Sequence, residues 1–459
     1  MIFFARYISL WKEGLYLAWP LILNHIFVTA MRTTDMFLTG YISPAAVTAV
    51  GLGDVWERII LRIGLGLGAG SISLISQESG SFDGQASENV DEVLSQVLLV
   101  GALVGLPFIL LGWLFSEEMI SVLGAELEVV KLGASYLFII FAAAPFRLIT
   151  LISARSLQGT GDTRTPMVVD IVSNLFNIGV SAVLALGLLG FPELGVRGVG
   201  WGTFSSKFLA TLMYLFVFLS AKSELNLQFP SQKWNLIIAL QLIKVSVPRS
   251  LQGGYQSLIT FPFNAIVLLF GTEAAAAYHI ARRIQQQLMA PIQRAFGTVS
   301  TIMAGHRLGG EDPETSRLTT RAILILTVLA ISALAVVLFI FSPSIVALFT
   351  EDEATIMAAT GFLRALSISA PLLSMYRVIS GLLTAAGDTR TPFYGLVISQ
   401  TVFKLGLSYL LSVQLGIGLM GVYAGLVFDY SFQAIWVIRR FRTNKWIMEA
   451  RDMIARRRQ

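Results

Sequence analysis

The chain has 459 residues, of which 55% are hydrophobic and only 13% charged, and its formal net charge is +5. Soluble globular proteins carry about 25% charged residues, so the composition excludes an ordinary soluble domain and indicates a protein of the lipid bilayer. The chain has no cysteine and three histidines, which excludes disulfides and cysteine metal sites and argues against a zinc centre. Its basic residues concentrate in loops and in the tail, which is typical of an inside-facing surface and not of a nucleic-acid interface.

Long apolar runs, separated by glycine, proline and charged residues, predict twelve membrane-spanning segments. A span needs about 20 apolar residues, and inside a bilayer the backbone must satisfy its own hydrogen bonds, which favours helices. The first run is too long for a cleavable signal, so we take it as the first span. The predicted spans are 14–40, 46–76, 92–115, 127–153, 166–190 and 196–222, then 238–270, 274–304, 317–345, 353–384, 392–413 and 418–440.

These spans predict an all-α polytopic membrane protein. We expect an N-terminal six-helix lobe at 1–222, a linker at 223–237, a C-terminal lobe at 238–441 and a basic tail at 442–459. Lysine and arginine in the short loops place both termini on the cytoplasmic side of the cell membrane. The tail is predicted to form an amphipathic helix on the anionic inner leaflet, with a disordered, solvated tail as the alternative. Its apolar residues at helical spacing are Trp446, Ile447, Ala450 and Ile454.

The hexapeptide Gly-Asp-Thr-Arg-Thr-Pro occurs at 161–166 and again at 387–392, an offset of 387 minus 161, or 226 residues. Such a repeat indicates an internal duplication. The same offset joins Ala144-Pro145 with Ala370-Pro371, Ser173 with Ser399, and Gly195-Val196 with Gly421-Val422. Each copy stands between two spans, where glycine relaxes the backbone, aspartate or threonine caps the next helix, and proline suits its first turn. The hexapeptide lacks the spacing and lysine of a phosphate-binding loop.

The paired hexapeptides and the two sets of six spans resemble the multidrug and toxic compound extrusion (MATE) transporters, and the DinF-like rather than the NorM-like branch. Further matching pieces are Gly271-Thr272 with the alanines at 274–277, the segment 280–284, and Asn177 followed by Gly195-Val196. The resemblance implies two pseudo-symmetric lobes around a V-shaped central cavity and cation-driven efflux of small organic solutes by alternating access. We expect a monomer in the bilayer, with H⁺ or Na⁺ as the coupling ion and no cofactor.

Ionisable residues at membrane depth are costly to bury and are functional candidates by default. In the first span, Asp35 shares a helical face with Asn24 and Arg32. The resemblance implies a coupling aspartate at the position of Asp35, so we expect Asp35 to take the ion. A structural pair between Asp35 and Arg32 is the alternative.

The fifth span places four polar residues on one face, at spacings of 4, 3 and 4: Asp170, Asn174, Asn177 and Ser181. The relatives that the chain resembles carry an aspartate four residues after the position of Asn177, where this chain has Ser181. Asp170 is a candidate replacement for that carboxylate, and favourable placement against the helix dipole is the alternative. We assign Asp170, Asn177 and Ser181 to the ion-coupling set.

The cavity is predicted from polar residues in four spans. The second span carries the stripe Asp54, Glu57, Arg58 and Arg62, and an offset of 229 leads to Arg283, Gln286, Gln287 and Pro291 in the eighth. The seventh span contributes Gln252, Gln256 and Asn264, and the first contributes Asn24 and Arg32. Because such residues are costly against lipid, we expect them to face the cavity, with salt bridges within the stripe as the alternative. The arginines make anionic or zwitterionic cargo an option beside the cationic amphiphiles that the resemblance implies.

The charge distribution predicts coupling in the N-terminal half. Gln256 stands where NorM-like relatives carry a glutamate, and Asn264 answers Asp35 at the offset of 229. Lys404 and Asp429 remain in the eleventh and twelfth spans, and we predict that they pair across helices. That pair is either static or opened by protonation of Asp429.

The resulting functional hypothesis is a secondary active antiporter that exchanges H⁺ or Na⁺ for an organic, multidrug-like solute. One alternative is a lipid-linked oligosaccharide flippase of the same superfamily, for which the arginines would supply a basic groove. A membrane enzyme is a third option, but the sequence offers no nucleophile, metal set or cofactor fingerprint. We therefore expect no enzymatic activity.

Overall fold

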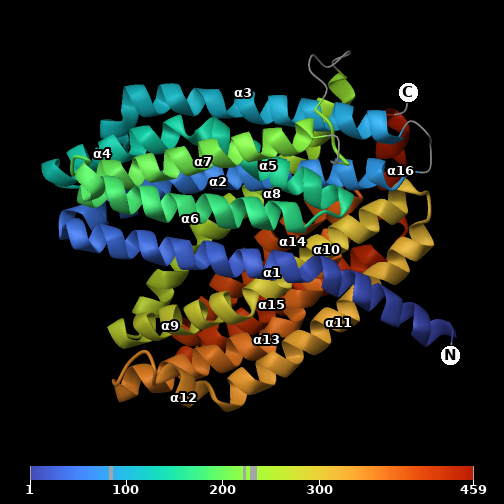
Figure 1. Ribbon diagram of the computed structural model, residues 1–459. Helices are drawn as coiled ribbons and strands as arrows, with labels where there is room; N and C mark the ends of the chain where they lie inside the picture. The colour runs from blue at the N-terminus through green and yellow to red at the C-terminus, as the bar shows by residue number, and fades with distance from the viewer. Residues whose placement is uncertain (1, 82–85, 221–223, 228–234, 458–459) are drawn as a thin grey trace. The chain divides into compact units, whose positions relative to one another are not determined.

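A computed structural model describes residues 2–81, 86–220, 224–227 and 235–457, except for the side chains of 2–4, 29–30, 32–33, 35–36 and 86–89. Nearly all regular structure in these ranges is α-helical (Figure 1). The first half contains α1 (Ile2–Ile42), α2 (Pro44–Ser79), α3 (Ala86–Ser121), α4 (Leu127–Ala142), α5 (Ala144–Thr160), α6 (Arg164–Leu186) and α7 (Val196–Leu219). The second half contains α8 (Leu236–Leu268), α9 (Thr272–Leu288), α10 (Ala290–Gly309), α11 (Pro313–Ile340), α12 (Ser342–Val346), α13 (Glu353–Ala385), α14 (Arg390–Ser399), α15 (Leu419–Arg442) and α16 (Lys445–Arg457).

The helices confirm a polytopic, all-α membrane protein. Among the described residues, eight helices are long and apolar enough to cross a bilayer, and a ninth is added if α4 and α5 form one bent span. Each predicted span has a helical counterpart, but some are broken. The fourth span bends by 47° between α4 and α5, where Pro145 enters the first turn of α5 and cannot donate a backbone hydrogen bond. The eighth is interrupted between α9 and α10, where Pro291 has the same effect.

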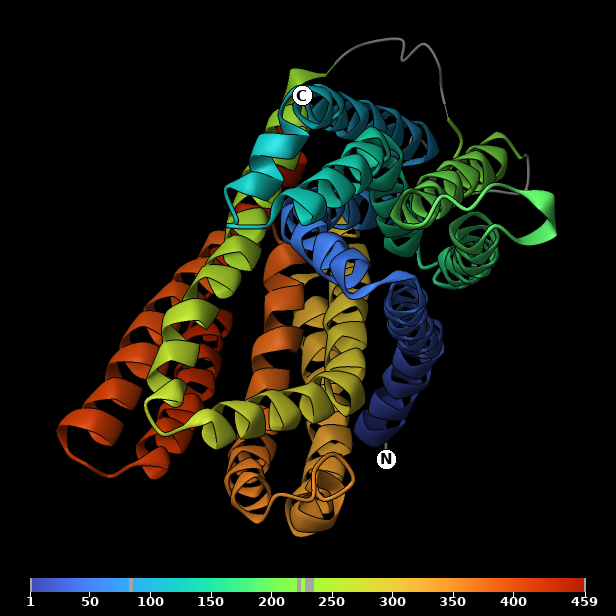
Figure 2. The same ribbon diagram turned by 90° about the vertical axis from the view of Figure 1, so that its left-hand side faces the viewer.

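The predicted eleventh span changes helix type along its length. It begins as α14 and continues as two π-helical segments, Gln400–Leu407 and Leu410–Gln414. Its repeat counterpart, α6, is α-helical throughout. Figure 2 shows this element in red, running beside α15 and joined to it by a short loop. The two halves therefore differ in backbone where their sequences are aligned.

The helices group into two compact units. One unit contains Leu23–Ser250, and the other contains Met1–Ile22 together with Leu251–Gln459. The boundaries lie inside the long helices α1 and α8, so each of these two helices contributes to both units. The units therefore differ in their bounds from the lobes predicted at 1–222 and 238–441. That those two lobes move during alternating access stays a prediction.

Glycines on α2 determine how closely its neighbours pack in the unit Leu23–Ser250. A β-carbon added to Gly66 would lie 2.6 Å from the backbone oxygen of Ser246, and one added to Gly68 would lie 2.7 Å from Cγ of Arg155. Only a residue without a side chain fits such contacts, so these glycines allow α8 and α5 to approach α2.

An aromatic cluster holds four helices together in the other unit. The Phe263 ring of α8 lies 5.1 Å from Tyr278 of α9, which lies 5.3 Å from Phe362 of α13. The Phe362 ring is in turn 4.7 Å from Tyr423 of α15. Aromatic contacts of this kind contribute about 0.5–1.5 kcal/mol each beyond burial.

The tail forms the predicted helix, α16, but its apolar face is not left for lipid. Trp446 and Ala450 are fully buried, and they belong to a core cluster with Phe441 and Leu308. The expectation of an apolar face resting on the inner leaflet is therefore wrong, because protein from the same unit covers that face. Arg451 and Arg456 remain on the exposed side.

Candidate functional site

The first hexapeptide is a turn that ends α5 and starts α6. Gly161 adopts φ 101°, the left-handed conformation that glycine tolerates best. The Asp162 Oδ1 atom accepts hydrogen bonds from the backbone N–H groups of Arg164 and Thr165 at 3.0 and 2.9 Å. The prediction of turn and cap chemistry is confirmed for this copy.

The second hexapeptide repeats the turn and adds a charged partner. Gly387 has φ 80°, and Asp388 accepts a bond of 3.0 Å from the Thr391 N–H. In addition, Arg440 of α15 donates from Nε to Asp388 over 2.7 Å and from Nη2 to Glu449 of α16 over 2.6 Å. This arginine therefore joins the second turn to the tail helix.

The polar face of α6 forms the centre of the candidate ion site. Asn24 of α1 donates from Nδ2 to Asp170 Oδ2 over 2.6 Å, which joins two residues that the sequence had assigned to separate sets. Lys207 of α7 and Arg155 of α5 act on Asp170 electrostatically. Asp170 thus has a hydrogen-bond partner on α1 and feels two cations, on α7 and α5, in addition to its place near the start of α6.

Further along α6, the polar groups are buried but only partly satisfied. Asn177 is 1% exposed and its Nδ2 lies 3.3 Å from Thr203 Oγ1 and 3.4 Å from Ser206 Oγ, both on α7. Its Oδ1 atom, the Asn174 Nδ2 atom and the Ser181 hydroxyl have no hydrogen-bond partner within the described part of the chain. Buried polar atoms are normally bonded, so this face is suited to accept a further ligand such as a proton, an ion or water.

The sequence places Asp35 and Arg32 in α1, but their side chains lie outside the described residues. The ion-accepting role of Asp35, and its alternative pairing with Arg32, stay predictions. The backbone of α1 carries Asp35 eleven residues after Asn24, which contacts the α6 face.

The charged stripe of α2 finds its partner on another helix. Arg147 of α5 donates from Nη1 to Glu57, and both side chains are largely buried at 12% and 16% exposure. The alternative of a salt bridge within the stripe is therefore wrong for Glu57, because α5 supplies the cation. Arg147 was missed from the sequence, although a lone arginine at membrane depth is the signal that would have found it. Asp54 and Arg62 are half-buried, whereas Arg58 is exposed.

The predicted cavity residues of the other unit divide into buried and exposed groups. Gln252 is buried and donates from Nε2 to the Tyr376 hydroxyl of α13, so it has a structural partner. Gln256 is half-buried, and the buried Oδ1 atom of Asn264 has no partner within the described residues. Arg283 and Gln286 are exposed on α9. Since the predicted cavity draws on both units, its joint lining stays a prediction.

Lys404 and Asp429 lie in the same unit but do not form the direct pair predicted for them. Asp429 Oδ1 accepts hydrogen bonds from Ser399 Oγ at 2.6 Å and from Gln433 Nε2 at 2.8 Å. Lys404 Nζ lies 4.7 Å from the centre of the Phe263 ring, in a cation–π contact. The two charges act on each other electrostatically across this arrangement.

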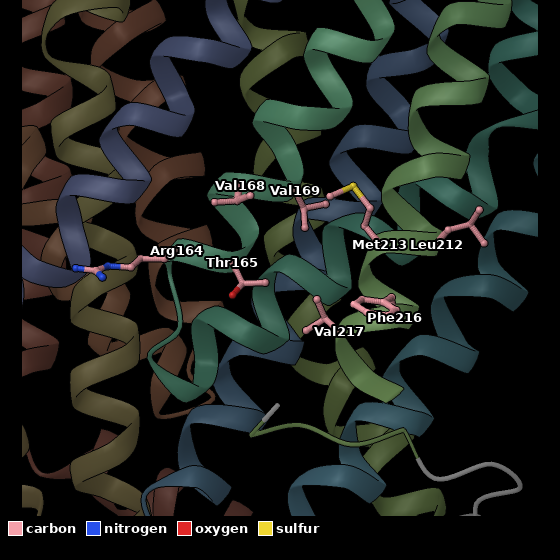
Figure 3. A pocket seen from close by; sticks show the side chains of 8 residues that line it. All are labelled: Arg164, Thr165, Val168, Val169, Leu212, Met213, Phe216 and Val217. Atoms are coloured by element: carbon pink, nitrogen blue, oxygen red, sulfur yellow. The ribbon is translucent and has the colours of Figure 1, made fainter. Parts of the chain in front are cut away.

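An apolar groove of about 490 Å³ lies between the start of α6 and the end of α7 (Figure 3). Arg164 and Thr165 of the first hexapeptide stand at one edge, and Arg164 extends away from the α7 side chains. The groove contains none of the predicted site residues. Its other lining residues are Val168, Val169, Leu212, Met213, Phe216 and Val217.

The points where two helices cross show which residues of the two repeats are structurally equivalent. In the first repeat, a β-carbon on Gly202 would lie 2.0 Å from Ser181 Oγ, and in the second, one on Gly425 would lie 2.0 Å from Ser408 Oγ. Ser181 therefore corresponds to Ser408 at an offset of 408 minus 181, or 227, and Gly202 to Gly425 at 425 minus 202, or 223.

This packing corrects one part of the sequence register. Gly198 crosses Leu184 and Ala185 as Gly421 crosses Leu411 and Ser412, so the structural equivalent of Gly421 is Gly198 and not Gly195. The offset rises from 226 at Ser173 to 227 at Ser181, which places one extra residue in the π-helical segment. A π-helix accommodates such an insertion because its hydrogen bonds join residues five apart.

Comparisons with known proteins agree with the duplicated architecture. A model of the MatE family matches residues 20–183 and 248–410, one segment in each half. The probable multidrug resistance protein YoeA of Bacillus subtilis is 26% identical over 444 residues, which cover 93% of this chain and 94% of that protein. The probable multidrug resistance protein NorM of Thermotoga maritima is 24% identical over 451 residues, with 97% and 95% coverage.

Solved structures show the same fold. A MATE protein described in a bent conformation has a TM-score of 0.87 at 20% identity, over 98% of this chain and 97% of its own. A transporter of the MOP superfamily from Pyrococcus furiosus has a TM-score of 0.85 at 20% identity, over 96% of both chains. With the family match extending through both repeats, the chain belongs to the MatE family of membrane transporters.

Proposed function

We propose that this protein is a secondary active antiporter that exports organic, multidrug-like solutes in exchange for H⁺ or Na⁺ by alternating access. The observation that carries the proposal is membership of the MatE family across both halves, beside relatives named as multidrug resistance proteins. The fold supports it, because an internal duplication provides two related bodies around which a transporter can alternate. A flippase for lipid-linked oligosaccharides is not favoured by these relatives.

The proposed ion-coupling set is Asp35 with Asp170, Asn177 and Ser181. The contact between Asn24 and Asp170 supports it, since α1, which also carries Asp35, is joined to the polar face of α6 at this point. Protonation or ion binding that changes the charge on this face would change how α1 packs. Bound ions at membrane depth commonly act through such interhelical polar contacts.

The proposed cargo is cationic or amphiphilic, with anionic or zwitterionic solutes as the second option that the arginines of α2 and α9 suggest. The DinF-like assignment is part of the proposal and rests on Gln256 in place of a glutamate, while the relatives carry both YoeA and NorM names. We further propose a monomer in the plasma membrane, with both termini cytoplasmic and no cofactor beyond the coupling ion.

The test is gradient-driven efflux from proteoliposomes, followed with one cationic and one anionic dye. Asp35→Asn should reduce efflux at least tenfold under the coupling gradient, and Asp170→Asn should reduce it to a smaller extent. Glu117→Gln, an exposed acidic residue at the end of α3, is the matched control and should leave efflux unchanged. Wild-type rates under separate proton and sodium gradients identify the ion. Efflux by Asp35→Asn at the wild-type rate would remove that residue from the mechanism, and no dye efflux by the wild type under either gradient would contradict the function.

A further inference from the structure

Asp429 of α15 is an acidic residue with an unusual environment for the membrane interior. It is 1% exposed, and Ser399 and Gln433 donate hydrogen bonds to its Oδ1 atom at 2.6 and 2.8 Å. Its Oδ2 atom has no hydrogen-bond partner within the described part of the chain. A buried carboxylate with one open oxygen is positioned to accept a proton, because the other oxygen keeps its partners in both charge states.

Lys404 is the counter-charge, but it is held at a distance. Its side chain is 7% exposed and its ammonium group rests on the Phe263 ring of α8 at 4.7 Å. The attraction to Asp429 is therefore electrostatic and not a closed ion pair. One turn earlier, Gln400 is 6% exposed and its Oε1 atom lacks a partner among the described residues, which leaves a second acceptor near the π-helical lysine.

The repeat alignment shows that neither charge has a charged counterpart in the N-terminal half. Counting four residues back from Ser181 and Ser408 pairs Asn177 with Lys404, and counting four residues on from Gly202 and Gly425 pairs Ser206 with Asp429. In the first repeat the equivalent groups, Asn177 and Ser206, are neutral and lie 3.4 Å apart. A charged pair in place of a neutral hydrogen bond is costly at membrane depth, which is typical of a functional site.

Within the described part of the chain, Lys404 is the charged group that acts on Asp429. Tyr430 follows it on α15, and the groups that act on Tyr430 are Tyr278 and Arg282 of α9 and Arg377 of α13. The α14 helix contributes the neutral Ser399. Among these groups, Lys404 is the cation that acts on Asp429 itself.

We propose that Asp429 is a second, proton-specific coupling site in the C-terminal half, with Lys404 as a tethered cation in place of a bound metal ion. A proton taken up from the aqueous phase adds to Asp429 Oδ2, and the neutral acid then loses its attraction for Lys404, whose ammonium group keeps its contact with Phe263 and is free to donate to Gln400. Loss of that proton restores the attraction. Sodium is excluded, because the ammonium group already supplies the positive charge that a carboxylate site would otherwise take from the ion.

The charge change at Asp429 reaches α8 through two contacts of the π-helical segment. Lys404 touches Phe263, and the hydroxyls of Thr401 and Tyr255 are hydrogen-bonded. The α8 helix belongs to both units, so a shift of the π-helical segment acts on an element that the units share. This coupling role rests on the proposed antiport function, whereas the protonation site itself does not.

Infrared difference spectroscopy of the purified full-length protein in nanodiscs tests the site without transport. The wild type should show a protonated-carboxyl band that grows as pH falls, and Asp429→Asn, which preserves the hydrogen-bond acceptor, should remove it. Lys404→Met removes the nearby cation and should make Asp429 easier to protonate. The midpoint of the band should therefore shift to higher pH, at a proton concentration at least tenfold lower than in the wild type. Asp170→Asn is the matched control, a second buried carboxyl whose removal should leave the Asp429 band in place. Sodium added at constant pH should not displace the band.

An unchanged band in Asp429→Asn, a midpoint indifferent to Lys404→Met, or displacement of the band by sodium would each overturn the proposal. The double variant Asp429→Asn with Lys404→Met removes both charges, so we expect it to fold to the same extent as the wild type. If it is folded and lacks the band, then loss of the band does not reflect misfolding. Efflux measurements on the same variants separate a failure of the proposed antiport function from a failure of the proposed protonation site. A wild type with the band but without efflux contradicts the antiport function alone, whereas full efflux by Asp429→Asn together with an absent wild-type band contradicts the site alone.

Discussion

Glu57 and Arg147 form an ion pair between two membrane helices, and the two side chains satisfy each other because neither has much access to water. Their exposure of 16% and 12% means that solvent screening is limited. Removing one partner from a buried pair leaves an uncompensated charge, whereas replacing both by neutral groups can be nearly neutral for stability. The salt bridge of Glu57 therefore joins α2 to α5 and not two residues of the α2 stripe.

Single and double substitutions of this pair should separate those two costs. Glu57→Gln and Arg147→Met are each expected to destabilise the protein by about 3 kcal/mol. The double variant should be more stable than either single one. The measurement is the unfolding midpoint of the purified protein in detergent. A double variant whose loss equals the sum of the two single losses would show that the residues do not act as a pair.

At the scale of elements, helix ends outside the membrane follow local rules. Asp312 caps α11 by accepting a 2.8 Å hydrogen bond from the Thr315 N–H, and Asp352 caps α13 in the same way through Thr355. The hydrogen bonds from Thr315 lower the pKa of Asp312 below its ordinary value, with a smaller contribution from Arg6 and Arg307. Because these bonds favour the ionised form, the cap is strongest when Asp312 is charged.

Asp312→Ala should lower the free energy of unfolding by about 1 kcal/mol, the usual cost of losing such a cap. The folded-state pKa is below the unfolded value of about 3.9, so the stabilisation is complete above that pH and is lost as pH falls through the folded pKa. Asp312→Asn is the control, since it retains a capping oxygen without a charge. The difference in melting temperature between wild type and Asp312→Asn should shrink as the pH is lowered from 6 towards about 3. A difference that grows on acidification would contradict the sign of the pKa shift.

At the scale of the whole molecule, each half of the chain contributes part of one helix to the unit formed mostly by the other half. The start of α1 packs on α11, where the Trp11 Nε1 atom donates to the Ala322 carbonyl oxygen at 2.9 Å and Arg6 donates to Thr315. In return, the start of α8 packs on the glycines of α2 through Ser246 and Ser250. Each unit is therefore built from both halves of the chain.

This exchange predicts how fragments will associate. Residues 1–227 and 228–459, expressed together as separate chains, should co-purify, because each supplies a helix segment to the other. A fragment 23–227 that lacks the start of α1 should recover at least tenfold less of its partner, measured by affinity purification of a tag on the second fragment. Equal recovery with and without residues 1–22 would show that the start of α1 does not hold the halves together.

The sequence by itself determined the features that depend on local composition and spacing. Twelve apolar runs, the duplication and the turn chemistry of both hexapeptides were predictable, because burial in lipid and left-handed glycine conformations act within a few residues. The polar face of α6 was predictable for the same reason, since helical periodicity fixes which side chains share a face.

Only the tertiary structure decided which residues meet across helices. Arg147 as the partner of Glu57, Tyr376 as the partner of Gln252 and Asn24 as the partner of Asp170 depend on helix rotation and crossing, which no local pattern encodes. A single extra residue in the π-helical segment changed the register between the repeats. Lys404 contacts the Phe263 ring, while Asp429 is bonded to Ser399 and Gln433. The apolar face of α16 is buried for a similar reason. An amphipathic pattern predicts that one face of a helix will be covered. Whether protein or lipid covers it depends on residues far away in the sequence, here Leu308 of α10.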